Sequence, residues 1–374
     1  MAALPQTLAR ADYPDGEARE LTAQCSFAAD GAHEPFSRLT DGEYRRPFSS
    51  KDGALVIRAP EGTAIATLYL CFAGEAEALV LEREKDGAWE TFAQESPDYA
   101  HATVSVPALS AVRIAATGGK ALALNELRVF SQGELPEDVQ QWRPTPQKAD
   151  LMLVVAHPDD EFLFFGGLIP WYAAQGRRVL VVYMTCQDTT RRAELLNGLW
   201  AAGLREYPVI GGFLDRSTRT LEAMYDAWTR EEVDSFFIKL IRVHQPDVLV
   251  THAVNGEYGH GAHRVCADAA LRVFDKTSDP MYLPQHSKAY GVWQVKKLYL
   301  HLYGQNSLRM DWARDAGGAT ALELARRGFE MHVSQRHFHL QDGEAARYDS
   351  AAFGLAKSVV GPDAAKDDFF ENLP

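Results

Sequence analysis

The fold of this chain is indicated by residues 151–161, which read Leu151-Met152-Leu153-Val154-Val155-Ala156-His157-Pro158-Asp159-Asp160-Glu161. The first six residues are all apolar, as expected of a strand that is buried on both faces of a parallel sheet. Apolar side chains then recur at helical spacing up to Gly176, so the polar residues lie where the strand ends and a helix begins. The stretch therefore predicts the first strand and helix of an α/β fold.

The same alternation continues along the chain. A second buried strand is expected at residues 179–184, a helix at 233–244 and a further strand at 248–250. Strands that alternate with helices in this way form a parallel sheet with right-handed crossovers. We therefore expect residues 143–374 to form a Rossmann-like α/β domain with a mostly parallel sheet.

The first part of the chain has a different pattern. Short runs of alternating apolar and polar residues recur up to about residue 130, and turn-forming pairs such as Asp86-Gly87 separate them. This pattern predicts an antiparallel β-sandwich. A linker with three prolines follows at residues 131–150. The expected domains are an all-β sandwich with its linker at residues 1–142 and the α/β domain at residues 143–374.

The composition excludes several classes of protein. The chain has 374 residues, of which 46% are hydrophobic and 24% charged, which is typical of a globular protein and excludes a disordered one. Its apolar runs are shorter than the roughly 18 residues that a membrane-spanning helix needs. The formal charge is −13, from 38 basic and 51 acidic residues. Nucleic acid and anionic membrane surfaces are therefore not expected as general partners.

The four cysteines lie far apart and form no Cys-x-x-Cys pair, which excludes a cysteine zinc finger and a disulfide-dense scaffold. Cys25 and Cys71 both lie in the expected sandwich. Free thiols are the expected state, and a bridge between these two residues is the alternative. The first residues lack the charged start and the apolar core of a signal peptide.

Two clusters of metal-binding side chains are expected at one edge of the sheet. His157 and Asp160 follow the first strand, and His260 and His263 follow the strand at residues 248–250. Ligands of open α/β sheets bind at the carboxyl ends of the strands. A catalytic zinc site uses three protein ligands of this kind and leaves one position open. Taken alone, the first cluster also suits a helix N-cap, but the second one favours a metal site.

These residues and their positions resemble the LmbE-like deacetylases. That family includes the PIG-L de-N-acetylases of N-acetylglucosaminyl-phosphatidylinositol and the mycothiol-pathway deacetylase. The resemblance rests on residues 156–161 and on the later Tyr258-Gly259-His260-Gly261-Ala262-His263, and it covers about residues 149–277. It implies a zinc-dependent hydrolase that removes the N-acetyl group from an N-acetylhexosamine-containing glycan or glycoconjugate and releases acetate.

The resemblance also implies roles for individual residues. His157, Asp160 and His263 match the three zinc ligands of the family. Asp159 matches the general base, which takes a proton from zinc-bound water. Such general-base catalysis typically contributes about 10²- to 10⁴-fold to the rate.

Three more residues match positions that contact the substrate or the transition state. His260 matches a histidine that stabilises the transition state or protonates the leaving amine, Tyr258 a mobile tyrosine that polarises the carbonyl, and Arg191 a substrate-contacting arginine. Family members often read His-Pro-Asp-His where this chain reads His260-Gly261-Ala262-His263. An aspartate that orients the first histidine is therefore missing here.

Other polar residues allow more than one interpretation. Asp215 suits either a pocket or a turn, and His252, at a strand end, suits a residue that supports the site. His332, His337 and His339 form a histidine-rich stretch that is expected to have ordinary surface or core roles.

The expected sandwich resembles the discoidin-like, galactose-binding-like domains. The resemblance rests on Leu39-Thr40-Asp41-Gly42 and on residues 123–130. Such modules bind sugars or calcium through loops and accompany secreted glycan-active enzymes; a purely structural role is the alternative. The resemblance implies an extracellular or cell-envelope location, with the cytoplasm as the alternative.

Two alternatives to a deacetylase stay open for the whole chain. One is a catalytically inactive carbohydrate-binding protein, and the other is a metal-dependent hydrolase of another bond, since a fold by itself does not define a substrate. The expected partner is an N-acetylated sugar or glycan. The oligomeric state has no signal in the sequence.

Overall fold

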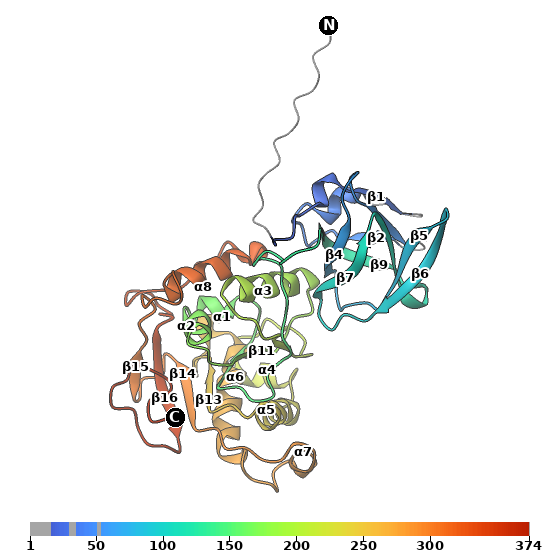
Figure 1. Cartoon of the computed structure of the whole chain (residues 1–374). Coiled ribbons are helices and arrows are strands. Elements are labelled where there is room, and N and C mark those ends of the chain that lie inside the picture. The colour runs from blue at the N-terminus through green and yellow to red at the C-terminus, as the bar shows by residue number, and fades with distance from the viewer. Residues whose placement is uncertain (1–15, 30–34, 51–53, 374) are drawn as a thin grey trace. The chain divides into compact units, whose positions relative to one another are not determined.

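The computed structural model describes residues 16–29, 35–50 and 54–373. Its internal contacts divide the chain into two compact units, Met1–Gln141 and Trp142–Pro374. Figure 1 shows that the first unit consists mainly of strands and that the second mixes strands with helices. Within the described ranges, no helix combines the length and the apolar character that crossing a membrane requires.

The first unit is built from two antiparallel sheets, with strand orders β1-β3-β8-β5-β6 and β2-β9-β4-β7 (Figure 1). Apolar side chains from both sheets, such as Leu55 and Ile57 from one and Leu127 and Val129 from the other, are fully buried in one core. This arrangement confirms the predicted β-sandwich. Its strands are β1 (Ser26–Ala29), β2 (Phe48–Ser50), β3 (Leu55–Arg58), β4 (Ile65–Phe72), β5 (Leu79–Lys85), β6 (Ala88–Glu95), β7 (His101–Leu109), β8 (Ala111–Ala116) and β9 (Leu122–Phe130).

All four cysteines are free thiols, so the alternative of a bridge between Cys25 and Cys71 is wrong. Burial raises the pKa of Cys25 to about 11 and that of Cys71 to about 12. Both thiols are therefore protonated at neutral pH, and they act as small packing residues.

His101 is a buried histidine at the start of β7. Its ring packs on Tyr44 and on the edge of Tyr69, and its Nδ1 lies 2.9 Å from Gln140 Oε1. Burial lowers the pKa of His101 to about 4, although the bond to Gln140 acts in the opposite direction. The folded unit therefore holds this imidazole in its neutral form at neutral pH.

His101 should make the first unit less stable as the pH falls from about 6.5 to about 4. An unfolded chain binds a proton at His101 near pH 6.5 and the folded one near pH 4, so this residue contributes about 3 kcal/mol in favour of unfolding over this interval. Burial raises the pKa of Glu126 in the same unit to about 7, which acts in the opposite direction, so the contribution of His101 is the difference between the wild-type protein and His101→Gln. Urea unfolding of both proteins at several pH values measures it. A difference in unfolding free energy that does not change with pH would contradict the assignment.

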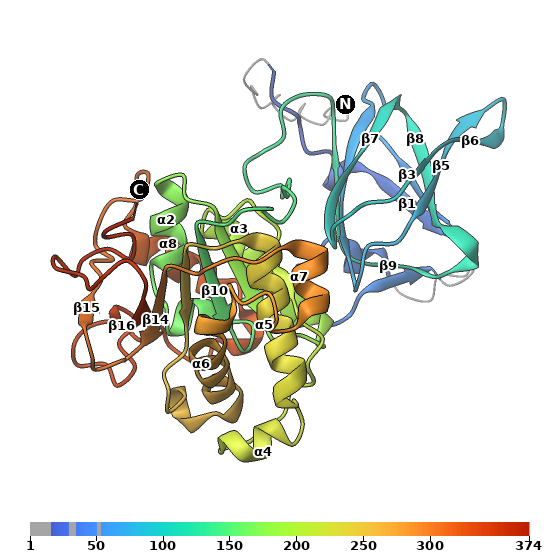
Figure 2. The same ribbon diagram turned by 90° about the horizontal axis from the view of Figure 1, so that it is seen from below.

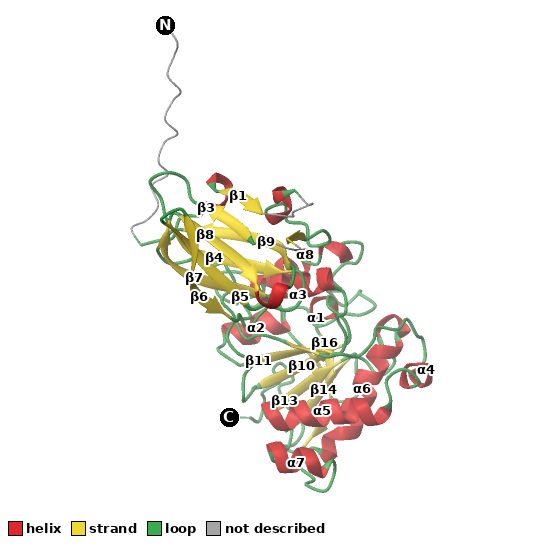
Figure 3. Ribbon diagram, turned by 90° about the vertical axis from the view of Figure 1, so that its right-hand side faces the viewer, coloured by secondary structure: helices red, strands yellow, loops and turns green. Residues whose placement is uncertain are grey.

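The second unit contains a seven-stranded sheet of order β12-β11-β10-β13-β14-β16-β15. Neighbouring strands from β12 to β14 are parallel, and β16 is antiparallel to both β14 and β15. This sheet, which Figure 3 shows edge-on between its helices, confirms the predicted mostly parallel α/β fold. Its strands are β10 (Leu151–Val155), β11 (Val179–Tyr183), β12 (Val209–Ile210), β13 (Val248–Thr251), β14 (Lys297–His301), β15 (Ser307–Arg309) and β16 (Ala352–Ser358).

Helices cover both faces of this sheet. Figure 2 shows α5, α6 and α7 together on one face, where α5 and α6 share an apolar core with the sheet, and α1, α2, α3 and α8 lie on the other. The strands between them are therefore buried on both faces, as their continuous apolar runs predict. The helices are α1 (Asp160–Leu163), α2 (Leu168–Ala174), α3 (Thr189–Ala201), α4 (Leu221–Tyr225), α5 (Arg230–His244), α6 (Gly261–Val273), α7 (Pro284–Tyr290) and α8 (Ala321–Glu330).

The prediction of one continuous helix after the first strand is wrong, because the structure has two shorter helices there, α1 and α2. Gly166 and Gly167 lie at the break, and Gly166 has a positive φ of 49°. A Cβ atom at Gly166 would lie 2.5 Å from Ser350 Oγ, and one at Gly167 would lie 2.8 Å from Ala321 Cβ. Segments from the far C-terminal part of the chain thus approach the backbone here, and only glycine leaves them room.

The strand order places a crevice beside β10. The chain proceeds from β10 to β11 on one side, and β13 later joins β10 on the other side, with Leu151 paired to Val248 and Val154 to Thr251. At such a reversal of strand order the connecting segments diverge beyond the carboxyl ends of the strands and leave a binding site between them.

Candidate metal centre

A pocket opens at this carboxyl edge, and all seven predicted site residues line it. It encloses about 630 Å³ of space, part of which is open solvent. Three of the residues follow β10, three precede or begin α6, and one begins α3. The structure therefore brings together side chains that lie more than 100 positions apart. They are His157, Asp159, Asp160, Arg191, Tyr258, His260 and His263.

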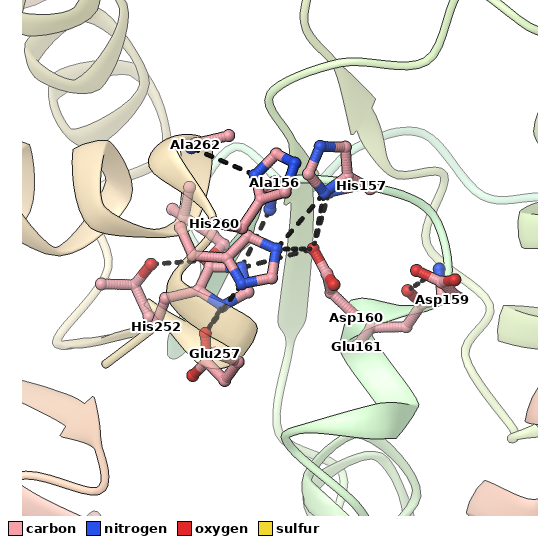
Figure 4. Close-up of polar contacts among 12 residues, drawn as sticks. Ala156, His157, Asp159, Asp160, Glu161, His252, Glu257, His260 and Ala262 are labelled. Atoms are coloured by element: carbon pink, nitrogen blue, oxygen red, sulfur yellow. Dashed lines mark hydrogen bonds and ion pairs between the residues drawn. The ribbon is translucent and has the colours of Figure 1, made fainter. Parts of the chain in front are cut away.

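Three donor atoms form a nearly equilateral triangle in this pocket. His157 Nδ1 lies 3.3 Å from Asp160 Oδ2, and His263 Nε2 lies 3.4 Å from each of these two atoms. Figure 4 shows His157 and Asp160 directed toward one another. Metal bonds of about 2.0 to 2.2 Å to imidazole and carboxylate separate the donors of a tetrahedral site by about 3.3 to 3.6 Å. These three residues fit a metal ion with one open position.

The partners of the two imidazoles indicate which nitrogens are free to bind a metal. His263 Nδ1 lies 2.9 Å from Glu257 Oε2, and His157 Nε2 lies 3.4 Å from Asp215 Oδ1. With these nitrogens as donors, a neutral ring presents the lone pair of its other nitrogen to the triangle. Burial favours the neutral rings, but Asp160 outweighs burial and raises the pKa of both histidines. A metal that binds here must displace protons, so its affinity falls at low pH.

Two other donor sets overlap with this triangle. His157, His260 and His263 form one, and Asp160, His252 and His263 form the other; within each set the donor atoms lie within 4.8 Å of one another. His252 Nε2 accepts a hydrogen bond from the backbone N–H of Ala156 at 3.0 Å, which occupies its lone pair. His157 and His263 are thus accompanied by two further donors, Asp160 and His260.

Metal content separates these two sets. If Asp160 is a ligand, Asp160→Asn should lose most of its metal, whereas His260→Ala should retain one ion per chain. The reverse pattern would assign the site to the three histidines. His263 belongs to both sets, so His263→Ala should lose metal in either case and serves as the positive control. Elemental analysis of the purified variants gives the stoichiometry.

Asp159 presents a carboxylate to the same pocket. It precedes α1, but its side chain makes no capping hydrogen bond, so the N-cap interpretation is wrong for this residue. Its φ of 108° is unusual for a residue with a Cβ, and such strain concentrates at functional sites. Burial and the neighbouring Asp160 charge raise the pKa of Asp159 to about 7, although Arg191 opposes them. A carboxylate with this pKa suits proton transfer near neutral pH.

The position of Asp159 is supported by a buried pair that sequence analysis missed. Glu161 Oε2 accepts a hydrogen bond from the Asp159 N–H at 2.8 Å, and Glu161 Oε1 lies 2.8 Å from His332 Nε2. Both side chains are fully buried. His332 is therefore a core residue, one of the two roles expected for the histidine-rich stretch. It contacts Glu161, the residue that holds the backbone of Asp159.

Arg191 lies close to Asp159. It is in the first turn of α3, and its Nη2 lies 3.2 Å from Asp159 Oδ1 and also contacts the Pro158 carbonyl. The α3 helix begins here because Asp188 accepts hydrogen bonds from the N–H groups of Thr190 and Arg191. Arg191 thus reaches the pocket from a helix whose N-terminus is held in place.

Asp215 also lines the pocket, so of its two predicted roles, a pocket residue or a turn residue, the structure supports the first. Its carboxylate contacts His157 Nε2, and that contact lowers the pKa of Asp215.

Aromatic side chains form the wall of the pocket next to Tyr258. The Tyr258 ring packs 4.7 Å from Tyr348, 5.5 Å from Phe164 and 6.1 Å from Phe338, measured between ring centroids. Its φ is 55°, the residue remains 39% exposed, and it lines the pocket. Burial raises the pKa of Tyr258, and the hydroxyl is a proton donor at neutral pH. Phe338, which sequence analysis missed, lines the pocket as well.

His260 caps α6 from the pocket side. Its Nδ1 accepts a hydrogen bond from the Ala262 N–H at 3.3 Å, so a neutral ring carries its proton on Nε2. Burial and the nearby charges of His157 and His263 lower the pKa of His260 to about 4. This histidine is therefore neutral at pH 7 and offers an N–H donor.

Residues 152–274 match the family described as PIG-L: GlcNAc-PI de-N-acetylase. A curated relative from Catenulispora acidiphila, named 1D-myo-inositol 2-acetamido-2-deoxy-alpha-D-glucopyranoside deacetylase 1, is 30% identical over 178 residues, which is 40% of this chain and 54% of the relative. The chain thus spans about half the length of that relative.

Two solved structures are also similar to parts of the chain. The N,N'-diacetylchitobiose deacetylase of Pyrococcus horikoshii has a TM-score of 0.39 at 20% identity, over 50% of this chain and 71% of the other. The family 32 CBM from C. perfringens NanJ, solved in complex with galactose, has a TM-score of 0.26 at 13% identity, over 30% of this chain and 99% of the other.

Proposed function

We propose that this chain is a zinc-dependent deacetylase, since residues 152–274 match the PIG-L family. It hydrolyses the N-acetyl group of an N-acetylhexosamine in a glycan or glycoconjugate and releases acetate. The observation that carries this proposal is the triangle of His157 Nδ1, Asp160 Oδ2 and His263 Nε2 in the same pocket as the carboxylate of Asp159. The name of the Catenulispora relative, a deacetylase of an N-acetylated glucosamine, supports the substrate class.

Zinc suits the donor set, because two imidazoles and one carboxylate with an open position are the ligands of many catalytic zinc sites. Such an ion lowers the pKa of water to about 7 and polarises a carbonyl group. The residues of the chain supply the remaining functions.

Asp159 moves the proton in the proposed reaction. Its carboxylate takes a proton from the attacking water and delivers it to the nitrogen of the leaving amine, so that water and the amide become acetate and a free amino sugar. A pKa of about 7 allows both transfers near neutral pH. Arg191, 3.2 Å from Asp159 Oδ1, holds the carboxylate toward the pocket.

His260 and Tyr258 stabilise the negative charge that develops on the carbonyl oxygen. His260 donates from Nε2 as a neutral ring, because its Nδ1 already accepts from Ala262. This role does not require the aspartate that the chain lacks at position 262. The Tyr258 hydroxyl is a second donor. Removal of one such donor typically lowers the rate by about 10²- to 10³-fold.

The aromatic wall of Phe164, Tyr258 and Phe338 suits a sugar. One face of a pyranose ring carries mainly C–H groups, which pack on aromatic rings, whereas its hydroxyl groups need polar partners. Arg191 and Asp215 line the same pocket and offer those partners. The pocket therefore combines a platform for the ring with a centre that acts on its acetamido group.

Asp159→Asn should retain zinc and lose turnover. The amide cannot accept the water proton, so kcat should fall by about 10²- to 10⁴-fold. Asp226→Asn, a change of the same kind at an exposed position at the end of α4, should keep the wild-type rate. Loss of zinc together with activity in Asp159→Asn would instead show that Asp159 is a ligand.

The proposed function is tested by metal content and acetate release together. Wild-type protein should contain one zinc ion per chain and release acetate from glycans that contain N-acetylglucosamine or N-acetylgalactosamine. Phosphate release from phosphoesters in place of acetate would assign it to another class of hydrolase. Failure to bind zinc would overturn the proposal and favour a carbohydrate-binding protein.

A further inference from the structure

Glu257 is a fully buried carboxylate between β13 and α6 that sequence analysis did not single out. Its Oε2 lies 2.7 Å from His252 Nδ1 and 2.9 Å from His263 Nδ1. Its Oε1 accepts a hydrogen bond from the backbone N–H of Ala253 at 3.0 Å and contacts His301 Nδ1. One carboxylate thus holds three imidazoles that come from β14, from the end of β13 and from α6.

The contacts of Glu257 indicate how these hydrogen bonds run. Its two oxygens face three imidazole nitrogens and one backbone N–H, and a carboxylate has enough acceptor sites for all four. With Glu257 as the acceptor, each of the three Nδ1 atoms is a donor. The lone pair of His263 Nε2 is therefore directed at His157 and Asp160.

His252 connects Glu257 to the segment that carries His157. Its ring stacks on the ring of His263, with centroids 4.0 Å apart and planes 18° apart. While its Nδ1 donates to Glu257, its Nε2 accepts from the N–H of Ala156, the residue before His157. A continuous chain of hydrogen bonds thus joins the end of β10 to Glu257, and Glu257 to the histidine on α6.

We infer that Glu257 is the positioning residue of the metal centre. It directs His263 Nε2 toward the metal, and through His252 it sets the distance between the segments that carry His157 and His263. Packing against His252 and Phe164 restricts the His263 ring, and the hydrogen bond to Glu257 defines which of its nitrogens is the donor. This inference rests on the metal centre of the proposed function, but it concerns the affinity for the ion and needs no substrate.

Zinc affinity in the absence of substrate tests the inference. Metal is removed from the full-length protein with a chelator, and zinc is titrated back in competition with a chromophoric chelator. Glu257→Gln keeps the size of the side chain but leaves one acceptor oxygen for three imidazole donors and one backbone donor. The zinc dissociation constant should rise by about 10- to 100-fold, the usual effect of losing a partner that orients a metal ligand.

Asp363→Asn is the matched control. Asp363 is a buried carboxylate of the same unit, and its partners are Lys297 Nζ and Tyr299 Oη. This change also replaces a buried carboxylate by an amide, so it should lower the stability of the fold. Its zinc dissociation constant should stay at the wild-type value. A similar loss of affinity in both variants would show that general destabilisation explains the effect, and would overturn the inference.

The remaining outcomes are also decisive. Wild-type zinc affinity in a folded Glu257→Gln protein would overturn the inference and leave the proposed function intact. Failure of the wild-type protein to bind zinc would overturn the proposed function itself. If Glu257→Gln does not fold, His252→Gln serves instead, because it keeps Glu257 but breaks its link to Ala156. That variant should bind zinc several-fold more weakly, and an unchanged affinity would overturn the inference.

Discussion

The site depends on the close approach of two imidazoles to Asp160 Oδ2. This oxygen accepts the backbone N–H of His157 at 2.8 Å and lies 3.3 to 3.4 Å from the imidazole nitrogens of His157 and His263. Burying this much polar surface is unfavourable unless each group finds a partner. The parallel register of β10 and β13 supplies those partners, because it brings the ends of both strands to the same point. The pocket, the helix starts and the aromatic wall are all arranged around that point.

Two adjacent carboxylates acquire opposite properties in this environment. Burial disfavours charge on both, but the neighbouring imidazoles of His263, His157 and His252 hold the pKa of Asp160 well below its usual range. Burial and the charge of Asp160 raise the pKa of Asp159 to about 7 and outweigh the opposing effects of Arg191 and His332. Such a separation of pKa values suits the proposed function, in which Asp160 binds a cation and Asp159 moves a proton.

Much of the fold could be predicted from local patterns. The apolar run at residues 151–156 is found as β10, and the helix expected at residues 233–244 as α5. The break between α1 and α2 could not be predicted, because it depends on Ser350 and Ala321, which approach Gly166 and Gly167 from far along the chain. Local periodicity contains no information about such an approach.

The sequence by itself determined the type of each domain and the residues that gather at the carboxyl edge, because strand ends and metal-binding side chains are both local features. Only the tertiary structure decided which buried residues support these side chains and which residues complete the pocket. His332 is 171 positions from Glu161, and His301 is 44 positions from Glu257. Phe338 reaches the pocket from beyond α8. Contacts of this kind depend on how sheet and helices pack, and no spacing rule in the sequence encodes them.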